Sequence, residues 1–201
     1  MARRGRPPGV DSEQTRHSIV EAARAVFAER GFAATTVASL AEAASLAPSA
    51  IYHYFGGKSE LYEAVFDATA DAIWSDLGSA AQQHGTLLAN IEQMVEDART
   101  LRSTRPHHSD FLALVPMEAR LHPEFAHLLD RRSKYQDATF GSLGLLGIET
   151  GEMRGFTVPE ATEIIRSAIM GWFFERHFRS QEIAGSGDAL VALFRTLASR
   201  D

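Results

Sequence analysis

Apolar residues recur every three or four positions along most of this chain, and this spacing limits the fold more than any other feature of the sequence. In residues 12–30, Ile19, Ala23, Val26 and Phe27 fall on one face of a helix. Similar spacing returns in later segments, and no segment alternates apolar and polar residues as a strand does. We therefore predict an all-α fold.

The N-terminal part of the chain predicts three helices of unequal length. A long helix from about Ser12 ends at Gly31, because glycine readily adopts the conformation that stops a helix. Thr36 offers a hydroxyl N-cap to a short second helix. Pro48 suits the first turn of a third helix, which Gly56 ends. One packing helix followed by two short helices indicates a helix-turn-helix domain.

The predicted boundaries give three parts: a flexible basic arm at residues 1–11, the helix-turn-helix domain at 12–57, and a larger helical domain at 58–201. The net charge of −6 is unevenly distributed among them. Residues 1–58 hold seven Lys and Arg against five Asp and Glu, whereas the rest holds 13 against 21. An excess of positive charge at one end is compatible with a nucleic-acid contact confined to that end.

Several classes of protein are disfavoured by what the sequence lacks. It has no cysteine, which excludes disulfides, thiolate metal sites and a cysteine nucleophile. No apolar run matches a signal peptide or a membrane span, so we expect a cytoplasmic protein without membrane contact. No catalytic or nucleotide-binding motif occurs, so we predict no enzyme and no cofactor. His122 and His127 lie one helical turn apart, but Pro123 breaks the helix between them, and we predict no metal site.

A block of residues near the N-terminus carries a more specific signal. It runs from Ile19 to Leu61 and includes Ala22-Ala23, Phe27, Arg30-Gly31-Phe32, Thr35-Thr36-Val37, Leu40-Ala41, Ile51-Tyr52-His53-Tyr54-Phe55 and Lys58. The spacing of these residues resembles that of the TetR family of bacterial repressors, over about the first 65 residues. The rest of the chain is similar to the family only in length and helical character.

The resemblance implies which side chains of the helix-turn-helix meet DNA. The predicted contacts with the phosphate backbone are Thr36, Tyr52, Tyr54 and Lys58, and the predicted contacts with base edges are Ser49, Ala50 and His53. The first half of a recognition helix reads bases in helix-turn-helix proteins. Successive aromatic residues cannot share one helical face, so Tyr52 and Tyr54 cannot both be core. A cation near a helix N-terminus is disfavoured by the dipole, and a phosphate partner would explain Lys58.

Two positions depart from the family pattern. Ser45 stands in the turn where the family usually has glycine, so it must accept the turn geometry without the freedom of glycine. Ala47 stands where Ser or Thr would cap the third helix, a loss of about 1 kcal/mol that the preset φ of Pro48 partly offsets. We expect the domain to fold despite both departures.

The arm carries three arginines, Arg3, Arg4 and Arg6, and no acidic residue up to Pro8. Such a segment can lie along a narrow minor groove. The alternative is a disordered, solvent-exposed tail that does not contact DNA. Both alternatives stay open.

The resemblance also implies an apolar ligand pocket enclosed by the middle helices. The predicted lining residues are Trp74, Phe111, Leu114, Met117, Phe140 and Trp172. Aromatic and Met side chains on several helices are equally what a packed core requires, so the sequence leaves both interpretations open.

The last two predicted helices are more apolar than one small domain can bury. Similar proteins pair these helices in a four-helix dimer interface, for which we predict Ile169, Phe173, Leu190 and Phe194. The alternative is complete burial within one protomer.

Together these expectations describe a ligand-responsive transcriptional regulator with an N-terminal DNA-binding domain and a C-terminal ligand-binding and dimerisation domain. We expect a homodimer that binds a near-palindromic operator in double-stranded DNA, acts as a repressor, and is released by a small apolar or amphipathic molecule. The alternatives are an enzyme that uses the C-terminal cavity and a DNA-binding protein that senses no ligand.

Overall fold

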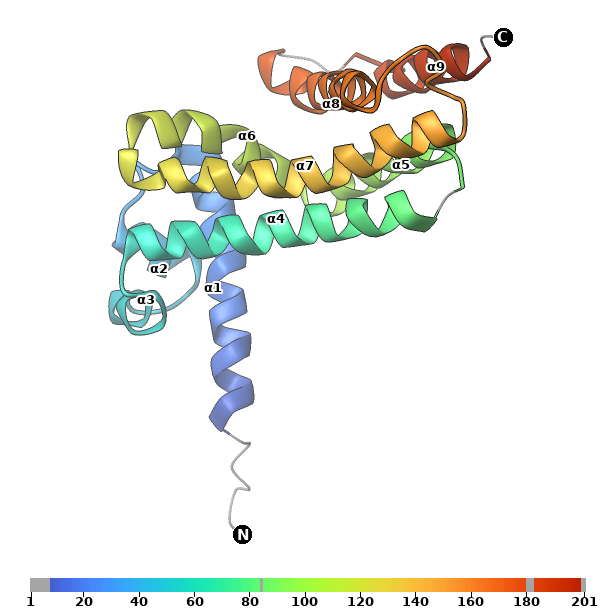
Figure 1. The fold of residues 1–201 in the computed structure, drawn as a ribbon. Helices are drawn as coiled ribbons and strands as arrows, with labels where there is room; N and C mark the ends of the chain where they lie inside the picture. The colour runs from blue at the N-terminus through green and yellow to red at the C-terminus, as the bar shows by residue number, and fades with distance from the viewer. Residues whose placement is uncertain (1–7, 84, 180–182, 200–201) are drawn as a thin grey trace. The chain divides into compact units, whose positions relative to one another are not determined.

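The computed structural model describes residues 8–83, 85–179 and 183–199, and the side chains of 12–74, 85–179 and 183–199. These residues form nine α-helices and two short 3-10 helices and contain no strand, so the predicted all-α fold is confirmed. The elements are α1 (Pro8–Arg30), α2 (Val37–Ala43), α3 (Pro48–Phe55), α4 (Lys58–Gln83), α5 (Leu87–Thr104), α6 (Pro106–Leu121), η1 (Pro123–Phe125), α7 (Ala126–Glu149), α8 (Val158–Glu175), η2 (Arg176–Phe178) and α9 (Ser186–Ala198) (Figure 1).

The chain folds into two compact units. Unit 1 contains the described residues up to Thr69 together with His107–Leu128, and unit 2 contains Ala70–Pro106 together with the described residues from Leu129 onward. α4 and α7 each begin in unit 1 and continue in unit 2. The units record which segments pack together. The functional division that we predict at residue 58 is a different one, and it stays a prediction.

Unit 1 contains the three N-terminal helices at the places the sequence predicts, with α2 packed against both α1 and α3 (Figure 1). Ile19 and Phe27 are buried on the predicted face of α1. α1 ends before Gly31, whose φ of 72° is in the left-handed region. Its start lies at Pro8, before the predicted start at Ser12, because the fixed φ of proline suits the first turn of a helix.

An aromatic cluster forms the core of unit 1 around Tyr62 of α4. The ring centroid of Tyr62 lies 5.0 Å from that of Phe27, 5.4 Å from Phe32, 5.1 Å from Phe111 and 4.6 Å from Phe125. Aromatic pairs at these distances stabilise the fold by more than the burial of their apolar area alone. The cluster joins α1 and α4 to α6 and η1, so α6 is part of the support of the helix-turn-helix.

A buried cation also links α1 to α4. The guanidinium of Arg24 is almost fully buried; its Nε donates to Thr69 Oγ1 at 2.8 Å and its Nη1 to Glu21 Oε2 at 2.5 Å. Burial raises the pKa of Glu21, but the hydrogen bond and charge of Arg24, with His108 and His17, outweigh burial and lower it. The charge of Arg24 is therefore paired where it is withdrawn from water, as a buried cation requires.

In unit 2, glycines let α7 pack closely against its neighbours. Gly141, Gly144 and Gly147 would each weaken a helix in isolation, but α7 continues through them to Glu149. A Cβ atom on Gly144 would lie 2.1 Å from Thr162 Oγ1 of α8, and one on Gly147 would lie 2.7 Å from Met153 Cγ. Close packing therefore accounts for Gly144 and Gly147, whereas a Cβ atom on Gly141 would meet nothing within 4 Å.

Candidate nucleic-acid interface

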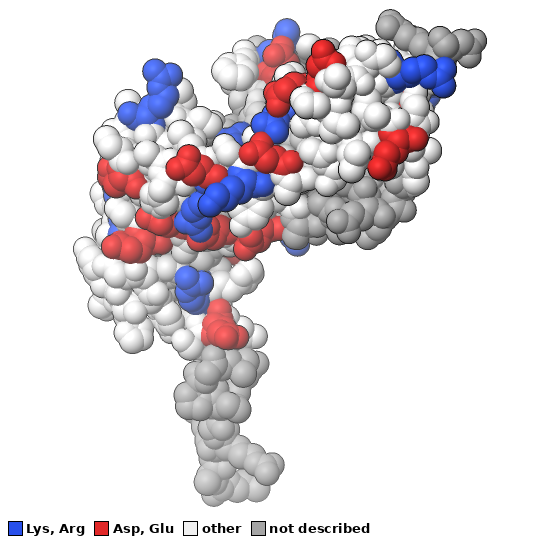
Figure 2. All heavy atoms as spheres, in the orientation of Figure 1, with Lys and Arg blue, Asp and Glu red and all other residues white. Residues whose placement is uncertain are grey.

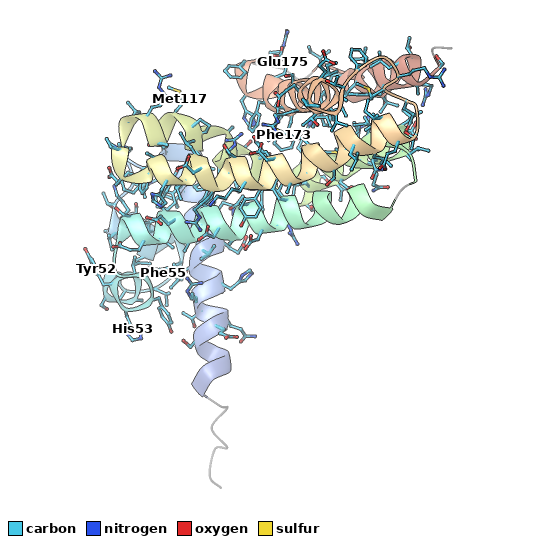
Figure 3. All side chains as sticks on the ribbon, viewed as in Figure 1. Tyr52, His53, Phe55, Met117, Phe173 and Glu175 are labelled. Atoms are coloured by element: carbon cyan, nitrogen blue, oxygen red, sulfur yellow. The ribbon has the colours of Figure 1, made fainter. Side chains whose placement is uncertain are left out.

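α3 has one buried face and one face open to solvent. Ile51 is fully buried, whereas Tyr52 is 57% exposed and His53 is exposed too. In Figure 3, Tyr52 and His53 point away from the other helices, and Phe55 points toward α1. Of the remaining predicted base contacts, Ser49 is exposed and Ala50 is half-buried. The exposed face therefore carries three of the side chains that we predict to meet DNA, Ser49, Tyr52 and His53, and that role stays a prediction.

α3 itself carries no negative charge, which suits an anionic partner. The sequence of α3 contains no Asp or Glu, and the surface over it is white in Figure 2, without an acidic side chain on the face shown. Ala47 gives the helix no side-chain cap, and Pro48 follows it at the first turn, as the sequence predicted. A polyanion that approaches this face meets no fixed negative charge from α3.

The N-terminus of α2 is capped by the residue that the sequence predicts. Thr36 Oγ1 accepts a hydrogen bond from Ser39 N at 3.1 Å, and Ser39 Oγ lies 3.1 Å from Thr36 N, which forms a capping box. Thr36 is exposed. Its hydroxyl is therefore fixed at a solvent-facing helix N-terminus, where a phosphate oxygen is favoured.

The turn between α2 and α3 uses a left-handed residue that is not glycine. Ser45 has a φ of 57°. Its N–H donates to Glu42 O at 2.9 Å, and the N–H of Leu46 donates to Ala41 O at 2.8 Å. This pair of bonds is a Schellman motif, which ends α2 and directs the chain into α3. The turn forms without the glycine that the family pattern has at this position.

The ammonium group of Lys58 binds carbonyl groups of unit 1. Its Nζ donates to Phe32 O at 2.9 Å and to Thr35 O at 2.8 Å, and it lies 4.0 Å from the ring centroid of Phe32. These bonds compete with the phosphate contact that we predict for Lys58. The sequence could not reveal them, because both carbonyls lie more than twenty residues before Lys58.

Two more side chains border the exposed face of α3. Tyr54 is half-buried, with its ring 5.0 Å from that of His53. Arg16 of α1 is exposed and places its guanidinium 4.8 Å from the ring centroid of Phe55. Arg16 is not among the residues predicted from the sequence. Its signal was the position three residues before the buried Ile19, on the side of α1 that turns toward the other helices.

The predicted minor-groove residues Arg3, Arg4 and Arg6 lie outside the described residues.

The residues that we predict to line a ligand pocket belong to both units, and their role in a pocket stays a prediction. Trp74 and Phe140 lie together in unit 2, with ring centroids 6.1 Å apart, and Trp172 of the same unit donates from Nε1 to Ser186 Oγ at 3.2 Å. Phe111 packs in the aromatic cluster of unit 1. Leu114 is half-buried on α6 and Met117 is 56% exposed, pointing outward in Figure 3. Phe111 and Met117 are therefore a core residue and a surface residue of unit 1, which helical periodicity alone could not distinguish.

Most of the residues predicted for the dimer interface are buried in the single protomer. Ile169, Leu190 and Phe194 belong to the core of unit 2, and Phe173 is half-buried. The prediction selected the most apolar face of each helix, and that face packs inside the protomer. The large apolar side chain that α9 leaves exposed, among those the structure describes, is Leu193.

Among the side chains that the structure describes, no three His, Asp or Glu residues are arranged to bind a metal ion. None of the described helices is long and apolar enough to cross a membrane.

Comparisons with known proteins agree with this geometry. Residues 19–65 match the family described as bacterial regulatory proteins, tetR family. The HTH-type transcriptional regulator TtgR of Pseudomonas putida is 35% identical over 101 residues, which are 46% of this chain and 48% of TtgR. The chain thus spans about half the length of the Pseudomonas relatives it matches.

Two further comparisons extend over nearly the whole chain. The HTH-type transcriptional repressor AcnR of Corynebacterium glutamicum is 27% identical over 191 residues, which are 93% of this chain and 94% of AcnR. The solved structure of the transcriptional regulator FadR from Bacillus subtilis in complex with stearoyl-CoA superposes with a TM-score of 0.70 at 20% identity, covering 91% of this chain and 97% of that one. At this identity, the similarity to the FadR structure shows a shared fold.

Proposed function

We propose that this chain, which belongs to the TetR family of bacterial regulatory proteins, is a transcriptional regulator that binds double-stranded DNA through α2 and α3. The observation that carries the proposal is the exposed face of α3. It presents Tyr52 and His53 to solvent and contains no acidic residue. A helix of this kind can enter the major groove while the capped N-terminus of α2 meets the phosphate backbone.

Within this proposal the side chains have different roles. Thr36, Tyr52 and Tyr54 contact phosphates through their hydroxyl groups, and Ser49, Ala50 and His53 approach base edges. The arginines of the N-terminal arm follow the adjacent minor groove. Arg16, on the side of α1 that faces Phe55, adds a cation near the DNA backbone.

We further propose that the protein acts as a homodimer and represses transcription in the cytoplasm. A dimer presents two copies of α3 to the half-sites of a near-palindromic operator. An exposed leucine on α9 supports a partner surface at the end of the chain. Repression is the activity named for AcnR and for the KstR2 relatives of Mycobacterium tuberculosis.

The signal that we propose for release is a small apolar or amphipathic molecule bound by the C-terminal domain. Stearoyl-CoA in the FadR complex is amphipathic, and FadR has the same fold. Such a ligand releases DNA only if it binds the DNA-free conformation more tightly; a coupling of about 1–3 kcal/mol weakens DNA binding by roughly 5- to 150-fold.

The test is a fluorescence-anisotropy titration of the full-length protein against DNA from the region upstream of its own gene, with an unrelated duplex in parallel. We expect saturable binding that favours the upstream fragment. Tyr52→Phe should weaken binding to both duplexes. Arg16→Ala should do so and also lower the salt slope by about one, while Arg154→Ala, an exposed arginine of unit 2, should change neither.

The outcomes separate the proposals. No binding to either duplex at low salt would refute the assignment of DNA binding. Equal binding to both duplexes would refute operator recognition at this site. Binding that no apolar or amphipathic compound releases would favour the alternative in which the protein binds DNA without sensing a ligand.

A further inference from the structure

The turn between α1 and α2 is held by side chains from two other helices. It comprises residues 31–35 and leads directly into Thr36, the N-cap of α2. Thr35 Oγ1 donates to Gly31 O at 2.7 Å, and Thr35 N donates to Phe32 O at 3.2 Å. These two bonds are internal to the turn. Gly31 N also donates to Phe27 O of α1 at 2.9 Å. Two further contacts come from residues far away in the sequence.

Glu118 of α6 holds the turn from one side. Glu118 is buried, with a side chain 11% exposed, and its Oε1 accepts a hydrogen bond from Phe32 N at 2.8 Å. The same oxygen occupies the space beside Gly31, where a Cβ atom would lie 2.6 Å from it. His122 Nε2 lies 3.4 Å from the other carboxylate oxygen. A buried carboxylate that accepts from a backbone N–H is a strong and directional contact.

Lys58 of α4 holds the turn from the other side. Its ammonium binds the carbonyl groups of Phe32 and Thr35 and lies over the Phe32 ring. Phe32 is therefore held at both backbone groups, by a carboxylate at its N–H and by an ammonium at its carbonyl. An ammonium has three N–H donors, and two of those of Lys58 are in use inside the protein.

We propose that Lys58 and Glu118 are paired positioning residues that fix the α1–α2 turn, and with it Thr36, for the contact with DNA, and that Lys58 does not itself bind phosphate. This inference rests on the proposed DNA binding. It assigns Lys58 a different role from the one that its place in the sequence predicts. Through Glu118, α6 also contacts the α1–α2 turn directly, at Phe32, which lies 86 residues earlier in the chain.

The salt dependence of DNA binding distinguishes the two roles of Lys58. A lysine that binds phosphate contributes about 0.9 to the slope of log K against log salt, whereas a lysine that positions a turn contributes none. We expect Lys58→Met to weaken binding to both duplexes about tenfold and to leave the slope unchanged. Lys134→Met, the same change at the exposed lysine of unit 2, should alter neither quantity.

A second variant keeps the test decisive if Lys58→Met proves unstable. Lys58→Arg keeps the positive charge, so a phosphate contact would survive it with nearly full affinity. The planar guanidinium does not reproduce the geometry of an ammonium between two carbonyls. We therefore expect Lys58→Arg to lose affinity as well, again without a change of slope.

The role of Glu118 is tested on the protein without DNA and then with it. Glu118→Ala should speed amide hydrogen exchange at Phe32 in the native state, while amides of unit 2 keep their rates. Glu118→Gln retains a side-chain oxygen that can accept from Phe32 N–H, so it should restore slow exchange and most of the affinity. Because both residues act through Phe32, the Lys58→Met/Glu118→Ala double variant should lose less affinity than the product of the single losses.

Two results would overturn the inference. One is a slope that falls by about one in Lys58→Met with full affinity in Lys58→Arg, which identifies a phosphate contact. The other is unchanged exchange at Phe32 in Glu118→Ala, which shows that the carboxylate does not hold the turn. If the wild-type protein binds neither duplex, the proposed function fails and with it the role in DNA binding, and the exchange measurement still decides whether Glu118 holds the turn.

Discussion

Ser45 has the left-handed backbone that the turn between α2 and α3 requires. A side chain in this conformation costs about 1 kcal/mol or more relative to glycine. We expect Ser45→Gly to raise the free energy of unfolding by about 0.5–1 kcal/mol, because the greater freedom of glycine in the unfolded chain offsets part of the gain. Urea denaturation measures the change. Ser45→Ala keeps the Cβ atom and should show no gain; an equal gain in both variants would show that strain is not the cause.

Tyr62 makes the stability of the protein sensitive to alkaline pH. Its hydroxyl is buried without a hydrogen-bond partner among the described residues. Burial, and then the charge of Glu118, raise the pKa of Tyr62 above its ordinary value. The unfolded chain loses this proton near pH 10, whereas the folded chain keeps it. The stability that the protonated Tyr62 gives the folded state is therefore fully present below about pH 10, and it is lost as the pH rises further.

Tyr62→Phe tests this effect. We expect the variant to be at least as stable as the wild type at pH 7, because it removes a buried unpaired hydroxyl. Its free energy of unfolding should fall less than that of the wild type between pH 9 and pH 11 in urea titrations. The pKa of Tyr135 is also raised, by its hydrogen bond to Asp71, but Tyr135 is present in both proteins. Parallel pH profiles of the two proteins would contradict the assignment to Tyr62.

At the scale of helices, periodicity and end signals predicted α1, α2 and α3 because these elements depend on neighbours in the sequence. Gly31, Thr36 and Pro48 act on the helix beside them, and each stands where it was expected. The place of α6 could not be predicted in the same way. Phe111 and Glu118 find their partners more than eighty residues earlier, in and beside α1. Helical periodicity predicts which face of a helix is apolar, but it does not predict which other element packs against that face.

The same limit explains the candidate site. The exposed side of α3 followed from the burial of Ile51 and the helical repeat, whereas the partners of Lys58 depend on the path of the α1–α2 turn. In α8 and α9, large apolar residues such as Ile169 and Phe194 are buried in the core of the protomer. Sequence reasoning could therefore identify these helices as strongly apolar, but not which of their apolar side chains stay exposed in the protomer.

For the whole molecule, the exposed side of α9 leads to a prediction about assembly. Leu193 is 49% exposed on α9, and Leu145 is 47% exposed on α7 of the same unit. If α9 forms the proposed dimer interface, Leu193→Glu places a charge in an apolar contact and should yield a monomer. Leu145→Glu should remain dimeric with the same thermal stability. Light scattering after size exclusion gives the mass of each. A dimer that persists in Leu193→Glu would locate the interface elsewhere.

The two tryptophans of the chain both lie in unit 2, where Trp74 packs against Phe140 and Trp172 donates a hydrogen bond to Ser186. Unit 1 contains tyrosines, among them Tyr52 and Tyr62, and no tryptophan. Excitation at the red edge of indole absorption therefore gives an optical signal from unit 2 alone. The natural protein can report local melting, or occupancy of its C-terminal part, without a dye, and the tyrosines on and around α3 leave that signal undisturbed.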